Sequence, residues 1–395
     1  NLGLRGLKLP TITTPIYWNW ISLVRQKLWK ITNAIYMDGW ESPVYHVNSL
    51  LLRRRRLKII YGYRSTSASH RFKGPIVRTI RRRIFNLADY IVTSGSASTQ
   101  AVLETGIARE KIIELFNPVD VRYFAEYSHS HRDSSTAGHR FLFAGQLIER
   151  KNVLNTIRAF AQIANPDDSL TIAGDGPLRS QIRELIEELN LVDQVRMVGH
   201  KNQEELAFIY ANSDTLVMPS TNEVWGLVAN EALASGVHVI VSDVSGVSDF
   251  IKNMQGAYIC ETNVESIALK MTESRGNHAG PVKDPEILKF TPERFAEELE
   301  RIILTLVKHQ SMKDLVWITN VSTPYRVALW HSLSTKIDLH VVLLSNNELG
   351  TKWQVPNQIE VENLGLRGLK LPTITTPIYL NWIPLVRQKL WKITN

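Results

Sequence analysis

Short apolar, β-branched segments alternate with helical segments along most of the chain, and this alternation constrains the fold more than any other feature. In the middle of the chain the apolar runs are RFLFAGQ (140–146), SLTIAGDG (169–176), QVRMVG (194–199), TLVMPS (215–220) and HVIVSD (238–243). Between them lie segments such as 178–190, whose apolar residues recur at helical spacing. Apolar strands separated by helices predict parallel sheets that are covered by helices.

The same alternation continues on both sides of this middle block. The further expected strands are 34–40, 58–63, 90–95, 112–117, 315–321 and 339–345. Polar residues without periodicity fill 126–139, which we interpret as a linker. The sequence therefore predicts an α/β protein with two Rossmann-like domains, each a doubly wound parallel sheet, and 140–290 forms one of them.

The first 33 residues of the chain occur a second time at its end. Residues 1–33 recur as 363–395, with two substitutions, Trp18 to Leu380 and Ser22 to Pro384. A repeat that occurs only twice, at opposite ends, is not typical of a solenoid. Only one copy can occupy its place in a domain, so we expect the other to be displaced or swapped into a neighbouring molecule, and a domain-swapped oligomer is an alternative to a monomer.

The position of the repeat suggests a permuted chain. Met312 precedes an apolar strand, as at the opening of a Rossmann-like domain. Reading 312–395 and then 34–311 gives one continuous two-domain order. We therefore expect a chain that is circularly permuted or spans two tandem copies, in which 312–395 and 34–125 form one domain together.

Charge is distributed unevenly. Residues 126–311 carry 17 Lys and Arg against 26 Asp and Glu, although the whole chain has a net charge of +8. Basic runs occur at 53–56 and 78–83, and 16–31 mixes Trp with Lys and Arg at helical spacing. These segments fit solvated helix faces or an anionic membrane surface. Charge alone would also allow nucleic acid, but no nucleic-acid motif accompanies it, so we do not expect a nucleic-acid partner.

Cysteine content and hydropathy limit where the chain can work. Cys260 is the single cysteine, which excludes an internal disulfide and favours a reducing compartment. The sequence contains no run of about 18 apolar residues, so it predicts no transmembrane helix. We expect a cytoplasmic protein, with peripheral attachment to the inner face of the membrane as the alternative.

Two glutamates flank a predicted turn in PSTNEVWGLVANEALASGVHVIVSD (219–243). Gly226 lies between Glu223 and Glu231, where a loop passes into a helix. Exposed N–H groups at a helix start attract anions, whereas ionised carboxylates accept hydrogen bonds from a vicinal diol. The spacing fits a sugar–diphosphate–ribose ligand lying across the turn. The alternative is a pair of glutamates on a solvated helix surface.

Two other strand ends carry residues suited to phosphates. AGQLIERKN (144–152) places Arg150 and Lys151 after a strand and before a helix, where a lysine can meet phosphates. The alternative is a solvated charge pair. AGDGP (173–177) ends another strand, and its glycines permit close approach to a ligand or form a tight turn.

Together these segments resemble a known family. GQLIERKN, AGDGP, VRMVGH (195–200) and ANSDTLVMPSTNEVWGLVANEALASG (211–236) resemble, in order and spacing, the donor-binding lobe of family 4 glycosyltransferases, which have the GT-B fold. ITNVSTPYR (318–326), YGYRSTSASH (61–70) and LFNPVD (115–120) are similar, more weakly, to the acceptor lobe of a bacterial branch. FTPERFAEELERIILTL is similar to the family's closing helix, which we place within 291–311.

The resemblance implies an activity. It implies a hexosyltransferase that moves a sugar, with retention of configuration, from a nucleotide sugar to a glycan or lipid-linked acceptor in cell-surface polysaccharide synthesis. A UDP-sugar is favoured and a GDP-sugar is the rival. No metal or other cofactor is expected. The alternatives are a GT-B nucleotide-sugar epimerase and an inactive nucleotide-binding protein.

The resemblance also implies roles for single residues. Glu231 would hold the ribose diol, Glu223 would bind hydroxyls of the sugar, and Lys151 would neutralise the diphosphate. Further donor contacts would come from Gly145, Gln146, Arg150, Gly174, Asp175, Gly199, His200, Thr221, Asn222, Gly226, Leu227 and Val228. Gln146 departs from the arginine that is frequent in the family, so diphosphate binding would depend more on Lys151. The acceptor-side candidates are Tyr325, Arg326, Arg64 and His70, and for His70 the alternative is an exposed loop residue.

Overall fold

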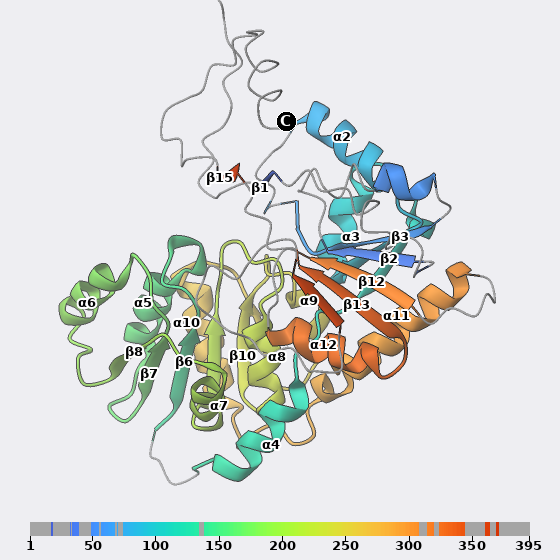
Figure 1. Ribbon diagram of the computed structural model, residues 1–395. Helices are drawn as coiled ribbons and strands as arrows, with labels where there is room; N and C mark the ends of the chain where they lie inside the picture. The colour runs from blue at the N-terminus through green and yellow to red at the C-terminus, as the bar shows by residue number, and fades with distance from the viewer. Residues whose placement is uncertain are drawn as a thin grey trace, which may run out of the picture.

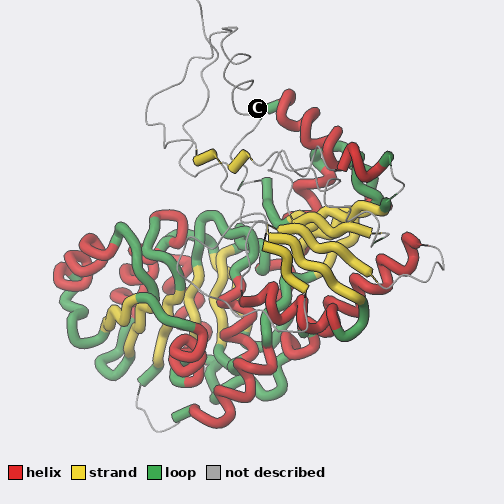
Figure 2. Tube along the Cα trace, viewed as in Figure 1, coloured by secondary structure: helices red, strands yellow, loops and turns green. Residues whose placement is uncertain are grey.

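The computed structural model contains two α/β lobes that lie side by side (Figures 1 and 2). It describes residues 17–18, 32, 34–38, 49–54, 57–67, 69, 74–133, 138–307, 314–319, 324–343, 360–363 and 369–370. Each lobe contains one parallel sheet with covering helices, which confirms the predicted fold class.

The first lobe, which we call the central lobe, comprises residues 138–290 and has six strands in the order β11-β10-β9-β6-β7-β8. The strands are β6 (Arg140–Ala144), β7 (Ser169–Ala173), β8 (Val195–Gly199), β9 (Thr215–Met218), β10 (His238–Ser242) and β11 (Ala257–Cys260). The helices are η3 (Glu149–Lys151), α5 (Val153–Ile163), α6 (Arg179–Glu188), α7 (Gln203–Ala211), α8 (Leu227–Ala234), α9 (Ser248–Ile251), α10 (Val264–Gly276) and η4 (Glu286–Lys289). The strand order reverses between β6 and β9, as in doubly wound folds.

The second lobe, which we call the split lobe, is built from both ends of the chain and has seven strands in the order β14-β13-β12-β2-β3-β4-β5. The strands are β2 (Ala34–Asp38), β3 (Lys58–Tyr63), β4 (Tyr90–Ser94), β5 (Ile112–Leu115), β12 (Asp314–Thr319), β13 (Asp338–Leu343) and β14 (Glu360–Asn363). The helices are α2 (Pro75–Phe85), α3 (Gly95–Leu103), η2 (Arg109–Lys111) and α12 (Pro324–Ser334). All neighbouring strands are parallel, and the order reverses between β12 and β2.

Alternating strand side chains build the cores. In β6, Phe141 and Phe143 enter a cluster with residues of α5, α6 and α10, whereas Leu142 and Ala144 enter a cluster on the other face. This is the two-residue period of a strand that is buried on both faces. The second cluster also contains residues of the split lobe, such as Trp317, so one hydrophobic cluster spans both lobes while each lobe keeps a further cluster of its own.

The predicted linker is shorter than we expected. Helix α4 (Val121–His131) covers the first six residues of 126–139, so the expectation of irregular structure is wrong there. Asp120 caps the helix by accepting a hydrogen bond from the N–H of Tyr123, and Phe124 and Ser128 are buried at helical spacing. This buried face stabilises a helix whose exposed side is polar enough to resemble a loop in the sequence.

The predicted closing helix returns the chain to the split lobe. Helix α11 (Pro292–Val307) packs against α12, as Figure 1 shows. Glu293 accepts a hydrogen bond from Ser332 at 3.4 Å, and Lys336 lies 3.5 Å from Glu297. The helix therefore connects the last residues of the central lobe to β12.

Little of the repeat lies within the described residues. Strand β1 (Tyr17–Trp18), from the first copy, pairs antiparallel with β15 (Leu369–Lys370), from the second copy. The prediction that one copy packs and the other is displaced otherwise lies outside the described part of the chain. Among the described helices, none has the length and apolar character needed to cross a membrane.

Candidate functional site

The loops that follow β6 and β9 meet at the carboxyl edge of the central sheet. Asn152 has a left-handed backbone (φ 61°) between η3 and α5, and its side chain donates to the carbonyls of Pro219 at 3.1 Å and Thr262 at 2.8 Å. The N–H of Thr221 donates to the carbonyl of Arg150 at 2.9 Å. These contacts hold the predicted phosphate-binding loop against the loop that carries Glu223.

The structure brings Lys151 and Glu223 into direct contact. Lys151 Nζ donates to Glu223 Oε2, and both side chains are 13% exposed. Arg150 lies 3.6 Å from the same carboxylate oxygen and donates to the carbonyl of Asn222 at 3.2 Å. One oxygen of the Glu223 carboxylate therefore has two cations beside it.

Gly226 begins helix α8 with a positive φ of 102°. This backbone conformation strains any residue with a side chain, so the turn favours glycine, and a Cβ here would also lie 2.5 Å from the flexible end of Met218. The N–H of Gly246 donates to the carbonyl of Glu223 at 3.0 Å, and that of Val247 donates to Trp225 at 3.1 Å. These bonds fix the turn, and α8 starts at Leu227, where the sequence predicted a helix start. The binding of an anion by the N–H groups of Leu227 and Val228 stays a prediction.

Glu231 lies one turn further along α8. Tyr210 Oη donates to Glu231 Oε2 at 2.9 Å. Part of the Glu231 side chain reaches solvent, but the surrounding protein desolvates the carboxylate and raises its pKa to about 7, while the Tyr210 hydrogen bond opposes this rise. The carboxylate is therefore poised between its two protonation states near neutral pH. The sequence offered no signal for Tyr210, which approaches only through the packing of α7 on α8.

Packing requires glycine at position 174, in the neighbouring loop after β7. A Cβ on Gly174 would lie 1.8 Å from the carbonyl oxygen of Gly145, and the N–H of Gly174 donates to the carbonyl of Gly199 at 2.8 Å. Asp175 accepts from the N–H of Gly176 at 2.8 Å and lies 3.5 Å from Arg179. These contacts fit the tight-turn alternative, and contact of Gly174 and Asp175 with a ligand stays a prediction. Gln146, His200 and Thr221 are exposed around them.

The split lobe places a second charged group at the end of its sheet. Arg326 Nε lies 2.7 Å from Asp38 Oδ2, and Arg64 lies 3.7 Å from Asp38 Oδ1. The sequence analysis missed Asp38, although its place at the end of the strand AIYMD was a usable signal. Tyr325 belongs to α12, but its side chain lies outside the described part of the chain, as does the whole of His70.

The lobes touch beside the turn at Gly226. Trp225 Nε1 donates to Asn230 Oδ1 at 3.2 Å, and the Asn230 amide donates to the carbonyl of Asn117 at 3.2 Å. A Cβ on Gly95, at the start of α3, would lie 2.7 Å from the Trp225 ring. Ser96 donates to Asp249 at 2.7 Å. These contacts fix the central-lobe site relative to the split lobe.

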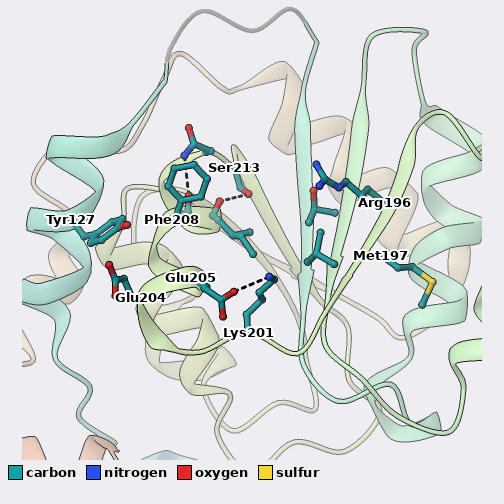
Figure 3. Close-up of a pocket in the computed structure, with 12 residues that line it drawn as sticks. Tyr127, Arg196, Met197, Lys201, Glu204, Glu205, Phe208 and Ser213 are labelled. Atoms are coloured by element: carbon teal, nitrogen blue, oxygen red, sulfur yellow. Dashed lines mark hydrogen bonds and ion pairs between the residues drawn. The ribbon is translucent and has the colours of Figure 1, made fainter.

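A separate cavity of about 770 Å³ lies in the central lobe, beside the edge strand β8. Figure 3 shows Tyr127 and Phe208 on one side and Arg196 on the other, with Lys201 paired to Glu205 at 2.9 Å. The lining residues are Tyr127, Thr171, Arg196, Met197, Val198, Lys201, Glu204, Glu205, Phe208, Ile209, Asn212 and Ser213. This set contains none of the site residues that the sequence predicted.

Comparisons with known proteins relate the central lobe to glycosyltransferases. Residues 130–274 match the family model of glycosyl transferases group 1. An uncharacterized glycosyltransferase of Methanocaldococcus jannaschii is 36% identical over 32% of this chain and 33% of its own length. N-acetyl-alpha-D-glucosaminyl L-malate synthase of Bacillus anthracis is 31% identical over 40% of this chain and 43% of its own length. The matched segments thus span less than half the length of these two relatives.

Solved structures show the fold. The Anabaena protein HepE in complex with UDP has a TM-score of 0.57 and 17% identity, and covers 71% of this chain and 81% of its own. The lipopolysaccharide outer core galactosyltransferase WaaB has a TM-score of 0.58 and 17% identity, and covers 72% of this chain and 78% of its own. The two lobes described above therefore form a GT-B fold.

Proposed function

We propose that this protein is a glycosyltransferase that moves a sugar from a UDP-sugar to an acceptor hydroxyl with retention of configuration. The observation that carries the proposal is the contact between Lys151 and Glu223 at the carboxyl ends of β6 and β9, beside the start of α8. The strand order reverses between β6 and β9, and a cation, a helix start and two carboxylates lie near this reversal. Such a set of groups fits a ligand that has a diphosphate between two polyols.

The proposed mechanism assigns one task to each group. When the diphosphate enters, Lys151 exchanges part of its contact with Glu223 for phosphate oxygens. Glu223 is then able to accept hydrogen bonds from hydroxyls of the sugar, and Glu231 accepts them from the ribose diol. The bond between the anomeric carbon and the diphosphate oxygen breaks, the acceptor oxygen bonds to that carbon, and the acceptor's proton passes to the departing diphosphate. Negative charge grows on the diphosphate as its bond breaks, and Lys151 with the N–H groups of Leu227 and Val228 stabilises it. We expect neither a metal nor another cofactor in this step.

Calorimetric titration with UDP and, separately, GDP tests the donor site. Micromolar binding of one nucleotide supports the proposal and identifies the nucleotide class. Transfer is then measured with the matching nucleotide sugars. An epimerised donor would favour the epimerase alternative, and binding without transfer would favour an inactive nucleotide-binding protein. Binding of neither nucleotide would contradict the donor-site assignment.

We further infer that the acceptor is a glycan or a lipid-linked molecule of cell-surface polysaccharide synthesis, met at an anionic membrane. Helix α2 lies at the outer edge of the split lobe (Figure 1) and exposes Ile76 (75%) and Ile80 (50%) one turn apart. The exposed arginines of this helix are Arg78, Arg82 and Arg83, and it contains no acidic residue. Exposed apolar residues among arginines suit the interface of an anionic bilayer.

Vesicle sedimentation tests this surface. We expect the protein to sediment with anionic vesicles and less with neutral ones, and Ile80→Asp to weaken this. Val192 in the central lobe is 64% exposed, so Val192→Asp is a matched control that should change nothing. Sedimentation that is independent of anionic lipid would refute the membrane surface and leave the donor site untouched.

The order of the split-lobe strands supports a permuted chain. Read from β12, the strands β12, β13 and β14 extend to one side and β2, β3, β4 and β5 to the other, which is the same winding as in the central lobe. We infer that 312–395 is the natural beginning of this lobe and that 34–125 completes it.

A further inference from the structure

The carboxyl edge of the split-lobe sheet carries a charged group that the donor site does not use. Asp38 is the last residue of β2, and Thr319 is the last residue of β12. Arg64 follows the end of β3, and Arg326 lies in the first turn of α12. The sheet order reverses between β12 and β2, and ligands of doubly wound sheets bind in the crevice at such a reversal.

Asp38 holds the two arginines together. Its Oδ2 lies 2.7 Å from Arg326 Nε and accepts from Thr319 Oγ1 at 3.5 Å, while its Oδ1 lies 3.7 Å from Arg64. The Asp38 side chain is 4% exposed, whereas those of Arg326 and Arg64 are 12% and 16% exposed. The carboxylate is therefore almost closed off, and both arginine side chains keep some access to solvent, although Arg326 Nε is itself buried.

The surroundings favour strong electrostatic interactions. Tyr36 lies beneath the group and stacks on Trp317 with ring centroids 3.9 Å apart. Burial raises the pKa of the Tyr36 hydroxyl, with Arg64 opposing this rise. Charges in such a partly desolvated environment interact more strongly than they do in water.

A purely structural role explains this arrangement less well. A buried ion pair contributes little stability that packed apolar residues could not supply, because both charges lose their hydration. Two guanidinium groups instead lie beside one carboxylate, and each is a planar fork of N–H donors. This geometry suits the oxygens of a phosphate or carboxylate, which arginine can bind in pairs.

We propose that Arg64 and Arg326 bind an anionic group of the acceptor, a phosphate or a carboxylate, and that Asp38 is the positioning residue that orients them. This proposal rests on the proposed function, because it treats the split lobe as the acceptor side. It specifies the substrate class further: the acceptor is an anion, not a neutral sugar.

The first experiment measures anion binding in the absence of turnover. The full chain is saturated with UDP, so that the donor site is filled, and is titrated with inorganic phosphate and separately with acetate. We expect Arg64→Gln/Arg326→Gln to weaken binding of the preferred anion by about tenfold or more. The Kd of UDP should stay unchanged. Tighter binding of phosphate points to a phosphorylated acceptor, and tighter binding of acetate points to an acidic sugar.

Three matched variants guard against a folding defect. Arg64→Lys/Arg326→Lys keeps both charges and removes the forks, so we expect an intermediate loss of anion affinity with an unchanged circular dichroism spectrum. Asp38→Asn should weaken the binding of anions if Asp38 orients the arginines. Tighter binding in Asp38→Asn would instead show that Asp38 competes with the ligand. Arg158→Gln, at an exposed arginine of α5 in the central lobe, should have no effect.

The outcomes separate this proposal from the proposed function. Anion binding that is equal in the wild type and in Arg64→Gln/Arg326→Gln overturns the proposal even if UDP binds. If UDP does not bind, the anion titration is run on Lys151→Ala, which removes the donor-site cation. Dependence on Arg64 and Arg326 would then support the anion site while the proposed donor fails.

Discussion

Lys151 Nζ donates a hydrogen bond to Glu223 Oε2 and so joins the loop after β6 to the loop after β9. Both side chains are mostly buried, and each charge is neutralised by the other. Breaking the pair leaves one charge without its partner, and a ligand that replaces the lost contact restores the balance. The contact therefore couples the expected phosphate site to the expected sugar site.

Replacing Lys151 with Ala should weaken the binding of UDP by about tenfold to a hundredfold, because a charge-assisted hydrogen bond is worth about 1.5–3 kcal/mol. Calorimetry at fixed pH and salt measures the change. Lys201→Ala is the control, since Lys201 is paired with Glu205 on α7 in the same lobe and should leave the Kd of UDP unchanged. Equal UDP affinity in Lys151→Ala and wild type would show that Lys151 does not meet the diphosphate.

The affinity for UDP should depend on the protonation of Glu231. Burial raises the pKa of this carboxyl group to about 7, and only its ionised form accepts two hydrogen bonds from a diol. Affinity is therefore full above the pKa and falls by up to about tenfold per pH unit below it. Titrations between about pH 6 and pH 8.5 measure this slope, and Glu231→Gln removes the contribution of Glu231 while leaving the titration of UDP itself.

Tyr210→Phe provides a second test of the same group. The Tyr210 hydrogen bond favours the ionised carboxylate, so its loss should raise the pKa of Glu231 and move the fall in affinity to higher pH. A pH profile that is the same in wild type, Tyr210→Phe and Glu231→Gln would contradict a ribose-binding role for Glu231.

The central lobe should unfold readily in acid because of a histidine cluster. His139 and His238 are buried, their ring centroids lie 5.0 Å and 4.9 Å from that of His278, and burial lowers the pKa of each of the two to about 4. A lowered folded pKa means that the unfolded state takes up protons first as the pH falls below about 6.5. Stability is thus fully present above that pH and is lost between about pH 6.5 and 4, on the order of 2 kcal/mol per histidine.

Urea unfolding at about pH 7 and pH 5 measures this loss. Nearby carboxylates, including Asp214 at 3.8 Å from His278, complicate the absolute values, so the comparison is made with His238→Asn. We expect the variant to lose less stability than the wild type between the two pH values. The same decrease in both proteins would contradict the assignment to His238.

The sequence predicted most strands because each one is a run of apolar residues that stands out from its surroundings. It missed β11 and β14, which are short; β11 follows Gly256, and β14 (EVEN) alternates with charged residues. It also took the start of 126–139 for a loop, because only Phe124 and Ser128, with Val121 before them, mark the buried face of α4. The period was present, but it covered little more than two turns.

Local motifs predicted that Lys151, Glu223 and Glu231 would belong to one region, because strand ends and helix starts place residues at the same edge of a parallel sheet. The contacts among side chains could not be predicted in this way. Glu223 meets Lys151, Glu231 meets Tyr210, and Asn230 reaches across to Asn117 in the other lobe. Each of these pairs joins distant parts of the sequence, and their meeting depends on how whole helices pack.

The order of the split-lobe strands leads to a last prediction. A chain rearranged to run from Met312 to Asn395 and then from Ala34 to Ser311 should fold to the same structure and bind UDP with the same affinity. In that chain one copy of the repeat connects β14 to β2, so the split lobe forms from one continuous segment and the entropy cost of closing it falls. The rearrangement cuts the chain between α11 and β12, but the contacts of α11 with Ser332 and Lys336 should keep this helix in place.

Circular dichroism, thermal unfolding and UDP calorimetry compare the two chains. A third chain that lacks only residues 1–33 shows whether that copy of the repeat is dispensable. Equal or higher thermal stability of the rearranged chain supports the permutation. If the original chain folds and the rearranged chain does not, the permutation is refuted.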